Sequence, residues 1–145
     1  MMKKKIPPMK YWDAKANCAQ SVSCGLLDSF DFTEGKEMLY PALIHFGAGF
    51  GEYSVCGAIS GGLSTIGLIL SKKGIDDDKI RELSEQFKKI ITEKFNSLLC
   101  RDYMKPYFAD NGEIDWDLKG RREKCTEMVQ KAFEEAKIII VDGLK

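Results

Sequence analysis

The sequence has no excess of charge of either sign. Among its 145 residues, 22 are Lys or Arg and 22 are Asp or Glu. Without a net positive field, neither nucleic acid nor an anionic membrane surface is expected to recruit the chain. The amino terminus also lacks a continuous apolar stretch, since Pro7, Pro8 and Lys10 interrupt the segment that follows Lys5. A secretory signal peptide is therefore not predicted, and we expect a cytoplasmic protein.

Several motifs of known chemistry are also missing. No Cys-x-x-Cys pair occurs, which removes support for a thioredoxin-like motif or a zinc ribbon. Glycines 47, 49 and 51 do not form a nucleotide loop, because no strand pattern precedes them and no Gly-Lys-Ser/Thr follows. Residues 76–78 lack the ligand spacing of a calcium loop and are expected to cap a helix. No repeat and no strand-helix alternation calls for a parallel sheet.

The apolar residues recur at three- and four-residue steps, which predicts helices. We expect an all-α fold, a single-domain bundle of about five helices over residues 1–145, with residues 1–9 as a flexible amino terminus. The expected helices span Trp12–Phe30, Glu34–Phe46, Tyr53–Lys73, Asp76–Leu98 and Lys119–Ile139. Pro41 is expected in a first turn, and the β-branched run at 138–141 is expected to fray into a short extended piece.

The third of these helices carries no charge from Tyr53 to Ser71. Its length is marginal for a membrane span, and four glycines dilute its hydropathy. We therefore predict a buried, glycine-rich central helix and no membrane span. Gly57 and Gly61, one turn apart, suit a tight helix crossing or a backbone wall beside cysteine sulfurs, and the two functions are compatible.

The chain has five cysteines on four separate segments, and an odd number does not suggest a fully paired disulfide scaffold. Cys24 follows Cys18 by six residues, which on a regular helix turns it about 120° away. It is therefore set apart from Cys18, Cys56, Cys100 and Cys125. Those four could form one redox or metal centre if the fold gathers them. The alternative is that all five are small buried apolar side chains.

The surroundings of three cysteines favour a thiolate. Cys56 is expected near the start of the central helix, where the helix dipole stabilises negative charge, and is the best single candidate for a reactive or ligating sulfur. Cys100 precedes Arg101, and Cys125 lies one turn after Arg121 and its neighbour Arg122. His45, the only histidine, has apolar neighbours and is expected to be a core residue rather than a ligand or base.

The order and spacing of these cysteines resemble a known family. The residues that carry the resemblance are Asn17-Cys18-Ala19-Gln20, the glycine-rich stretch from Phe46 to Gly51, Cys56-Gly57-Ala58-Ile59-Ser60-Gly61, Leu99-Cys100-Arg101 and Lys124-Cys125. Together they are similar to the C-GCAxxG-C-C family of redox-active proteins, and the similarity spans most of the chain. The resemblance implies four functional sulfurs, at positions 18, 56, 100 and 125, and leaves Cys24 outside the pattern.

Two mechanisms fit a centre of this kind. In one, the thiols cycle between reduced and disulfide states, with Cys56 attacking and a second cysteine resolving. In the other, the four cysteines hold a metal ion or an iron–sulfur cluster, with Cys56, Gly57, Ala58 and Gly61 forming the binding segment. The chain would then be an oxidoreductase, an electron carrier or a metal-delivery protein.

A non-catalytic alternative also stays open. Members of this family often lie near transporter genes, so the chain could be a helical accessory module of a transporter system with structural cysteines. A redox partner or a transporter-associated protein is the expected interaction, and a homo-oligomer is compatible with the composition.

Overall fold

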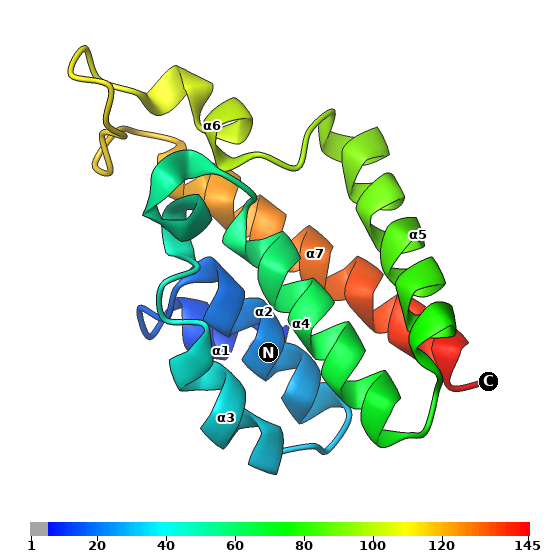
Figure 1. The fold of residues 1–145 in the computed structure, drawn as a ribbon. Coiled ribbons are helices and arrows are strands. Elements are labelled where there is room, and N and C mark those ends of the chain that lie inside the picture. Colours follow the sequence, from blue (N-terminus) through cyan, green and yellow to red (C-terminus); the bar gives the residue numbers. More distant parts are fainter. Residues whose placement is uncertain (1–5) are drawn as a thin grey trace, which may run out of the picture.

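Helices dominate the computed structural model, which describes residues 6–145 (Figure 1). Within that range no β-strand forms, so the all-α prediction is confirmed. Five helices have nine residues or more: α2 (Cys18–Ser29), α3 (Glu34–Ala42), α4 (Gly57–Lys72), α5 (Asp77–Phe95) and α7 (Arg121–Gly143). Shorter pieces are α1 (Met9–Trp12), α6 (Cys100–Tyr103), η1 (Gly49–Tyr53) and η2 (Lys105–Tyr107).

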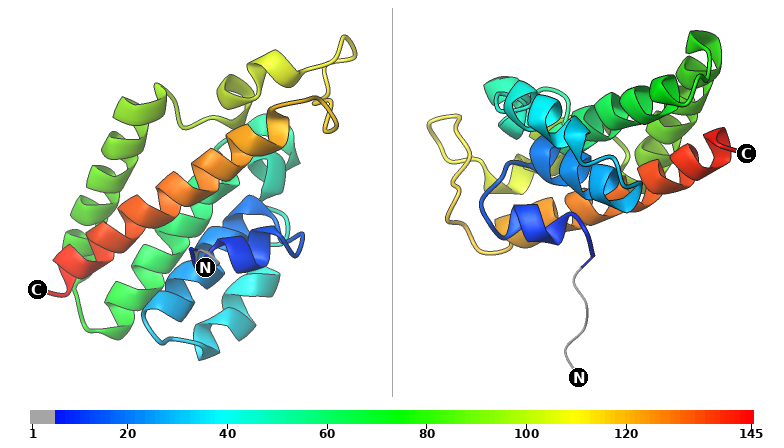
Figure 2. Two further views of the ribbon diagram at one scale, coloured as in Figure 1. Left: turned by 180° about the vertical axis from the view of Figure 1, so that it is seen from behind. Right: turned by 90° about the horizontal axis from the view of Figure 1, so that it is seen from below.

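Helix α4 is the central element of the bundle. It packs against α2, α5 and α7, and both views of Figure 2 show α7 running along it. Its inward side chains, including Ile59, Ile66 and Leu70, are fully buried, as is Phe87 on the facing side of α5. Burying an aliphatic or aromatic side chain of this size stabilises the fold by about 1.5–3 kcal/mol. No helix among residues 6–145 has the length and apolar character needed to cross a membrane.

Two glycines of α4 set its distance from α2. A Cβ added at Gly61 would overlap the Ala19 carbonyl oxygen and lie 2.8 Å from the Ala19 Cα. A Cβ added at Gly57 would overlap the Cys18 sulfur. The glycines therefore serve both functions that their spacing suggested, a tight helix crossing and a backbone wall beside a sulfur.

The prediction that the first helix begins at Trp12 is wrong. The chain leaves α1 after Trp12, turns through Lys15 at φ 69°, and starts again as α2 at Cys18. The cause is a capping box: the Asn17 side chain accepts a hydrogen bond from Gln20 N, and the Gln20 side chain accepts one from Asn17 N. Cys18 is therefore the first residue of a helix and not one in its middle.

The central helix also starts later than predicted. Residues 54–56 lie between η1 and α4 outside any helix, and Val55 pairs with Leu99 in an isolated antiparallel bridge. Cys56 N donates to Leu98 O at 2.9 Å, and Cys100 N donates to Ser54 O at 2.7 Å. Helix α4 then begins at Gly57 with Cys56 as its N-cap, and α6 begins at Cys100. This bridge places Cys56 and Cys100 side by side.

Other boundaries differ in smaller ways. Helix α3 ends at Ala42, so Pro41 lies in its last turn and not its first. The run at 138–141 stays helical to Gly143, because Ile139 and Ile140 are buried in the core. Residues 1–5 of the predicted flexible terminus lie outside the described range, while Pro8 is buried and Met9 begins α1. The predicted cap of α5 is confirmed, since the Asp76 side chain accepts from Lys79 N at 2.9 Å.

Candidate functional site

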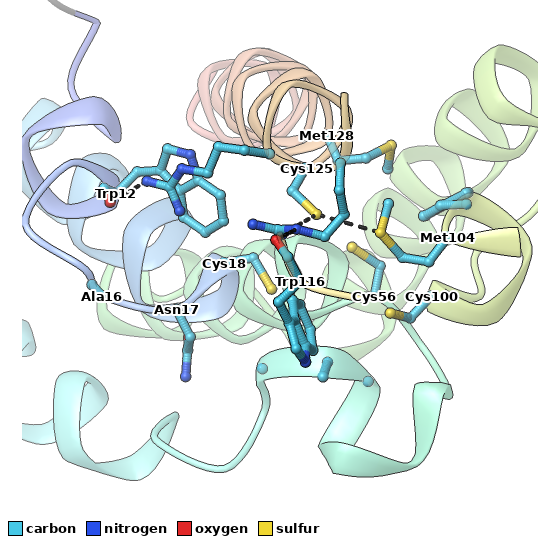
Figure 3. A pocket seen from close by; sticks show the side chains of 17 residues that line it. Trp12, Ala16, Asn17, Cys18, Cys56, Cys100, Met104, Trp116, Cys125 and Met128 are labelled. Carbon is cyan, nitrogen blue, oxygen red and sulfur yellow. Dashed lines mark hydrogen bonds between the residues drawn. The ribbon is translucent and has the colours of Figure 1, made fainter. Parts of the chain in front are cut away.

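Four cysteines line one cavity of about 370 Å³. They are Cys18, Cys56, Cys100 and Cys125, and Figure 3 shows their side chains around the same space. Each comes from a different helix or helix cap, so tertiary packing gathers them as the sequence analysis required. Cys24 is 1% exposed and does not line this cavity, in agreement with its rotation away from Cys18 on α2.

The cavity is surrounded by the starting ends of helices. Cys18 is the first residue of α2, Cys56 caps α4, and α7 begins at Arg121, four residues before Cys125. The first backbone N–H groups of a helix have no partner within the helix and carry partial positive charge. The fold therefore directs three such ends of long helices toward one small space, which favours negative charge there.

Cys18 is the cavity sulfur whose pKa this environment lowers. The hydrogen bond donated by the Cys56 thiol lowers the pKa of Cys18 most, and the backbone N–H groups of Ala19, Cys18 and Ala58 lower it further, against the opposing effect of burial. The pKa of Cys56 is raised well above the ordinary value by that same hydrogen bond, by burial and by the negative charge on Cys18. Within this pair the lowered pKa thus belongs to Cys18 and not to Cys56, the sulfur that the sequence favoured.

The other two cavity cysteines stay protonated. Burial raises the pKa of Cys100 to about 12. Arg101 does not counter this, because its side chain lies along the backbone of η1 and its Nε donates to Tyr53 O at 3.1 Å. Burial also raises the pKa of Cys125, although Arg121 opposes it from one turn away through a 3.4 Å contact between Nη1 and the sulfur. The expected effect of neighbouring arginines on the pKa is therefore present at Cys125, where burial outweighs it, and is not found at Cys100.

The predicted binding segment divides into two parts. Cys56 and Gly57 line the cavity, and the Ala58 N–H points at the Cys18 sulfur. Gly61 does not line the cavity and instead packs on Ala19. His45 lies on the surface in the turn after α3, so the prediction of a core histidine is wrong. It does not line the cavity either.

Sequence reasoning missed several lining residues. Trp12 and Trp116, together with Tyr103, Met104 and Met128, complete the cavity wall. Trp116 lies in the loop between η2 and α7, which has no periodic pattern to place it. Asn17 could have been found, because Asn-x-x-Gln before an apolar run is the pattern of a capping box. Its amide also donates to Leu43 O and Ile44 O, which ties the start of α2 to the end of α3.

Comparison with known families agrees with this cysteine arrangement. The model of the family described as "Putative redox-active protein (C_GCAxxG_C_C)" matches residues 16–139, a range that includes all four cavity cysteines. The chain belongs to this family. The match covers α2 to α7 and so most of the bundle. No curated protein and no solved structure matches the chain.

The C_GCAxxG_C_C cysteines do not form a metal ligand set in this arrangement. Among residues 6–145, no group of three or more His, Cys, Asp or Glu side chains is placed so that it could hold a metal ion. All five cysteines are free thiols. The donor geometry of the described residues therefore does not fit the metal or iron–sulfur alternative.

Proposed function

We propose that this protein catalyses thiol–disulfide exchange, with Cys18 as the attacking thiolate and Cys56 as the resolving thiol. The observation that carries the proposal is that two adjacent sulfurs have their pKa values shifted in opposite directions. The pKa of Cys18 is lowered by the Cys56 thiol and by N–H groups at the starts of α2 and α4, while the pKa of Cys56 is raised. Exchange needs a thiolate as nucleophile, and a neighbouring thiol completes a two-electron couple.

The first step forms a mixed disulfide. The Cys18 thiolate attacks one sulfur of a substrate disulfide, the Cys18 Sγ–S bond forms, the substrate S–S bond breaks, and one substrate thiolate leaves. Cys56 gives its proton to this leaving thiolate and becomes a thiolate. In the second step Cys56 attacks Cys18 Sγ, the protein disulfide forms, and the second substrate thiolate leaves to take a proton from water. The substrate gains two electrons and the protein loses two.

The pKa of Cys56 is suited to this order of events. The hydrogen bond to Cys18 and the charge on Cys18 are two of the three main causes that raise it. Both causes disappear once Cys18 is bonded to the substrate, while the Ala58 N–H still lowers the pKa of Cys56. Cys56 therefore keeps its proton while Cys18 needs a donor, and releases it when a second nucleophile is required.

Gly57 makes the close approach of the two sulfurs possible. A side chain at position 57 would overlap the Cys18 sulfur and would lie 2.7 Å from the Phe46 carbonyl oxygen. Only glycine leaves this space free while it keeps the start of α4 against the start of α2. The CGAxxG run thus supplies a resolving cysteine, a gap for the attacking sulfur and an N–H group directed at that sulfur.

Trapping the intermediate tests the proposal. Treated with a small disulfide, the Cys56→Ser variant is expected to accumulate a mixed disulfide on Cys18, because the second nucleophile is absent. The unchanged protein is expected to release both halves of the reagent and to contain a Cys18–Cys56 disulfide. Peptide mapping by mass spectrometry identifies both products.

A matched control uses the fifth cysteine. Cys24→Ser is expected to behave as the unchanged protein, since Cys24 lies outside the cavity. The proposal is wrong if the reagent attaches to Cys100 or Cys125 in the trapping variant, or if the protein disulfide joins a different pair.

A further inference from the structure

Arg121 carries a buried positive charge inside the cavity. Its side chain lines the cavity and the residue is only 9% exposed. Its Nε donates to Trp116 O at 2.9 Å and its Nη1 donates to the Cys125 sulfur at 3.4 Å, both of which are uncharged partners. No carboxylate in the described part of the chain forms an ion pair with it. A buried charge of this kind costs free energy unless an anion offsets it.

A second arginine stands at the mouth of the same cavity. Arg122 is exposed, and its guanidinium lies 3.9 Å from the centre of the Trp12 ring. Its Nη2 donates to Trp12 O at 2.8 Å, and it also lacks an ion pair within residues 6–145. The residues that line the cavity include no Asp and no Glu. The cavity therefore contains no carboxylate side chain that could pair with either guanidinium group.

The cysteines do not supply the missing charge to Arg121. Burial raises the pKa of Cys125, so its thiol is neutral beside the guanidinium. The charge on Cys18 already receives a hydrogen bond from Cys56 and three backbone N–H groups. An anion that enters the cavity would meet the arginines, the starts of α2 and α4, and the indole rings of Trp12 and Trp116.

We infer that Arg121 and Arg122 bind an anionic group of the substrate, and that the substrates are small, negatively charged disulfides. This inference rests on the proposed exchange at Cys18, and it names the substrate class of that reaction. A cavity of about 370 Å³ is the size of a small-molecule site. The planar guanidinium binds a carboxylate through two parallel hydrogen bonds, and the tryptophans offer apolar surface to the rest of the molecule.

Two aromatic disulfides, one anionic and one without negative charge, test this substrate assignment. Dithiobis(nitrobenzoate) carries a carboxylate on each ring, and dithiodipyridine carries no negative charge. The rate constant of Cys18 is measured with each reagent at one pH, and the ratio of the two removes any change in the thiolate fraction. In Arg121→Gln and in Arg122→Gln, this ratio is expected to fall at least about tenfold relative to the unchanged protein, because a charge-assisted hydrogen bond is lost.

Arg81→Gln is the matched control. Arg81 is an exposed arginine on α5 that pairs with Asp78, so the same loss of charge far from the cavity is expected to leave the ratio unchanged. An unchanged ratio in both cavity variants overturns the substrate assignment but leaves thiol exchange intact. Slow reaction of Cys18 with both reagents in the unchanged protein overturns the exchange reaction, and the substrate assignment with it.

A competition experiment avoids any variant that fails to fold. Nitrobenzoate has the anionic group but no disulfide, and nitrobenzamide is its uncharged analogue. In the unchanged protein, nitrobenzoate is expected to slow the reaction of Cys18 with dithiodipyridine, while nitrobenzamide at the same concentration is not. Equal effects of the two compounds, or no effect of either, contradict an anion site at the arginines.

Discussion

The lowered pKa of Cys18 depends on a hydrogen-bond donor from another helix. Cys56 donates the hydrogen bond that lowers the pKa of Cys18 most, and it comes from the cap of α4 while Cys18 begins α2. The pair therefore exists only after α2 and α4 have packed. The reactivity of Cys18 is therefore expected to change when Cys56 is replaced.

Removal of the donor is expected to slow Cys18. In Cys56→Ala the hydrogen bond to the Cys18 sulfur is lost, so the pKa of Cys18 rises and its alkylation near neutral pH slows about tenfold. Cys56→Ser keeps a hydroxyl donor and is expected to lie between the alanine variant and the unchanged protein. The measurement is the rate of iodoacetamide labelling at Cys18. Equal rates in all three proteins would show that Cys56 does not act on Cys18.

The sequence could identify the four cysteines but not the one that ionises. A helix start near Cys56 was visible, and it favoured Cys56 as the thiolate. In the folded chain Cys18 also lies at a helix start, and backbone groups from two helices point at its sulfur. Which of two adjacent sulfurs donates the hydrogen bond depends on their placement in space, and local sequence carries no information on that.

At the scale of helices, two glycines of α4 lie in different environments, one against the backbone of α2 and one in open space. Gly61 packs directly on the backbone of α2, whereas nothing lies within 4 Å of a Cβ added at Gly67 on the same helix. The two positions thus allow one substitution to be compared in two environments.

Gly61→Ala is expected to destabilise the protein by about 1–3 kcal/mol, because the added methyl forces α2 and α4 apart. Gly67→Ala is expected to be neutral or to stabilise by up to about 1 kcal/mol, since alanine favours the helix and meets no neighbour. Denaturant unfolding of both variants provides the comparison. Equal effects at the two positions would mean that the close crossing does not restrain the fold.

Helices with strong local signals could be predicted from the sequence, and those with non-local boundaries could not. The aspartates at the start of α5 and its apolar face predicted both where it begins and which side is buried. The apolar stripe of α7 from Met128 to Ile139 is also buried as expected. The start of α4 depends on the bridge between Val55 and Leu99, which are 44 positions apart in the chain. The secondary-structure propensities of neighbouring residues cannot predict a pairing between such distant positions.

At the scale of the whole molecule, burial favours the neutral form of several thiols. The free energy of unfolding is therefore expected to fall at alkaline pH. Burial raises the pKa of Cys24 to about 11 and that of Cys100 to about 12, compared with 9.0 for an ordinary thiol. Their contribution to stability is fully present below pH 9 and is lost as pH rises through the folded-state values. Cys18 has the opposite sign: its lowered pKa contributes stability that is lost as pH falls.

Cys24→Ala isolates this effect. The difference in unfolding free energy between the unchanged protein and the variant is expected to shrink by about 1.4 kcal/mol for each pH unit between about pH 9 and about pH 11. Denaturant titrations across that pH range give the slope. A constant difference would show that the Cys24 thiol ionises as freely in the folded chain as in the unfolded one.

The bundle brings the starts of α2, α4 and α7 to one cavity, and the lowered pKa of Cys18 is the chemical result. The most direct test is the pH dependence of alkylation at each cysteine, followed by peptide mapping. We predict that Cys18 reacts first and that its rate reaches half its maximum below pH 9.0, the ordinary thiol value. Faster labelling of Cys56, Cys100 or Cys125, or a midpoint for Cys18 at or above that pH, would contradict the account.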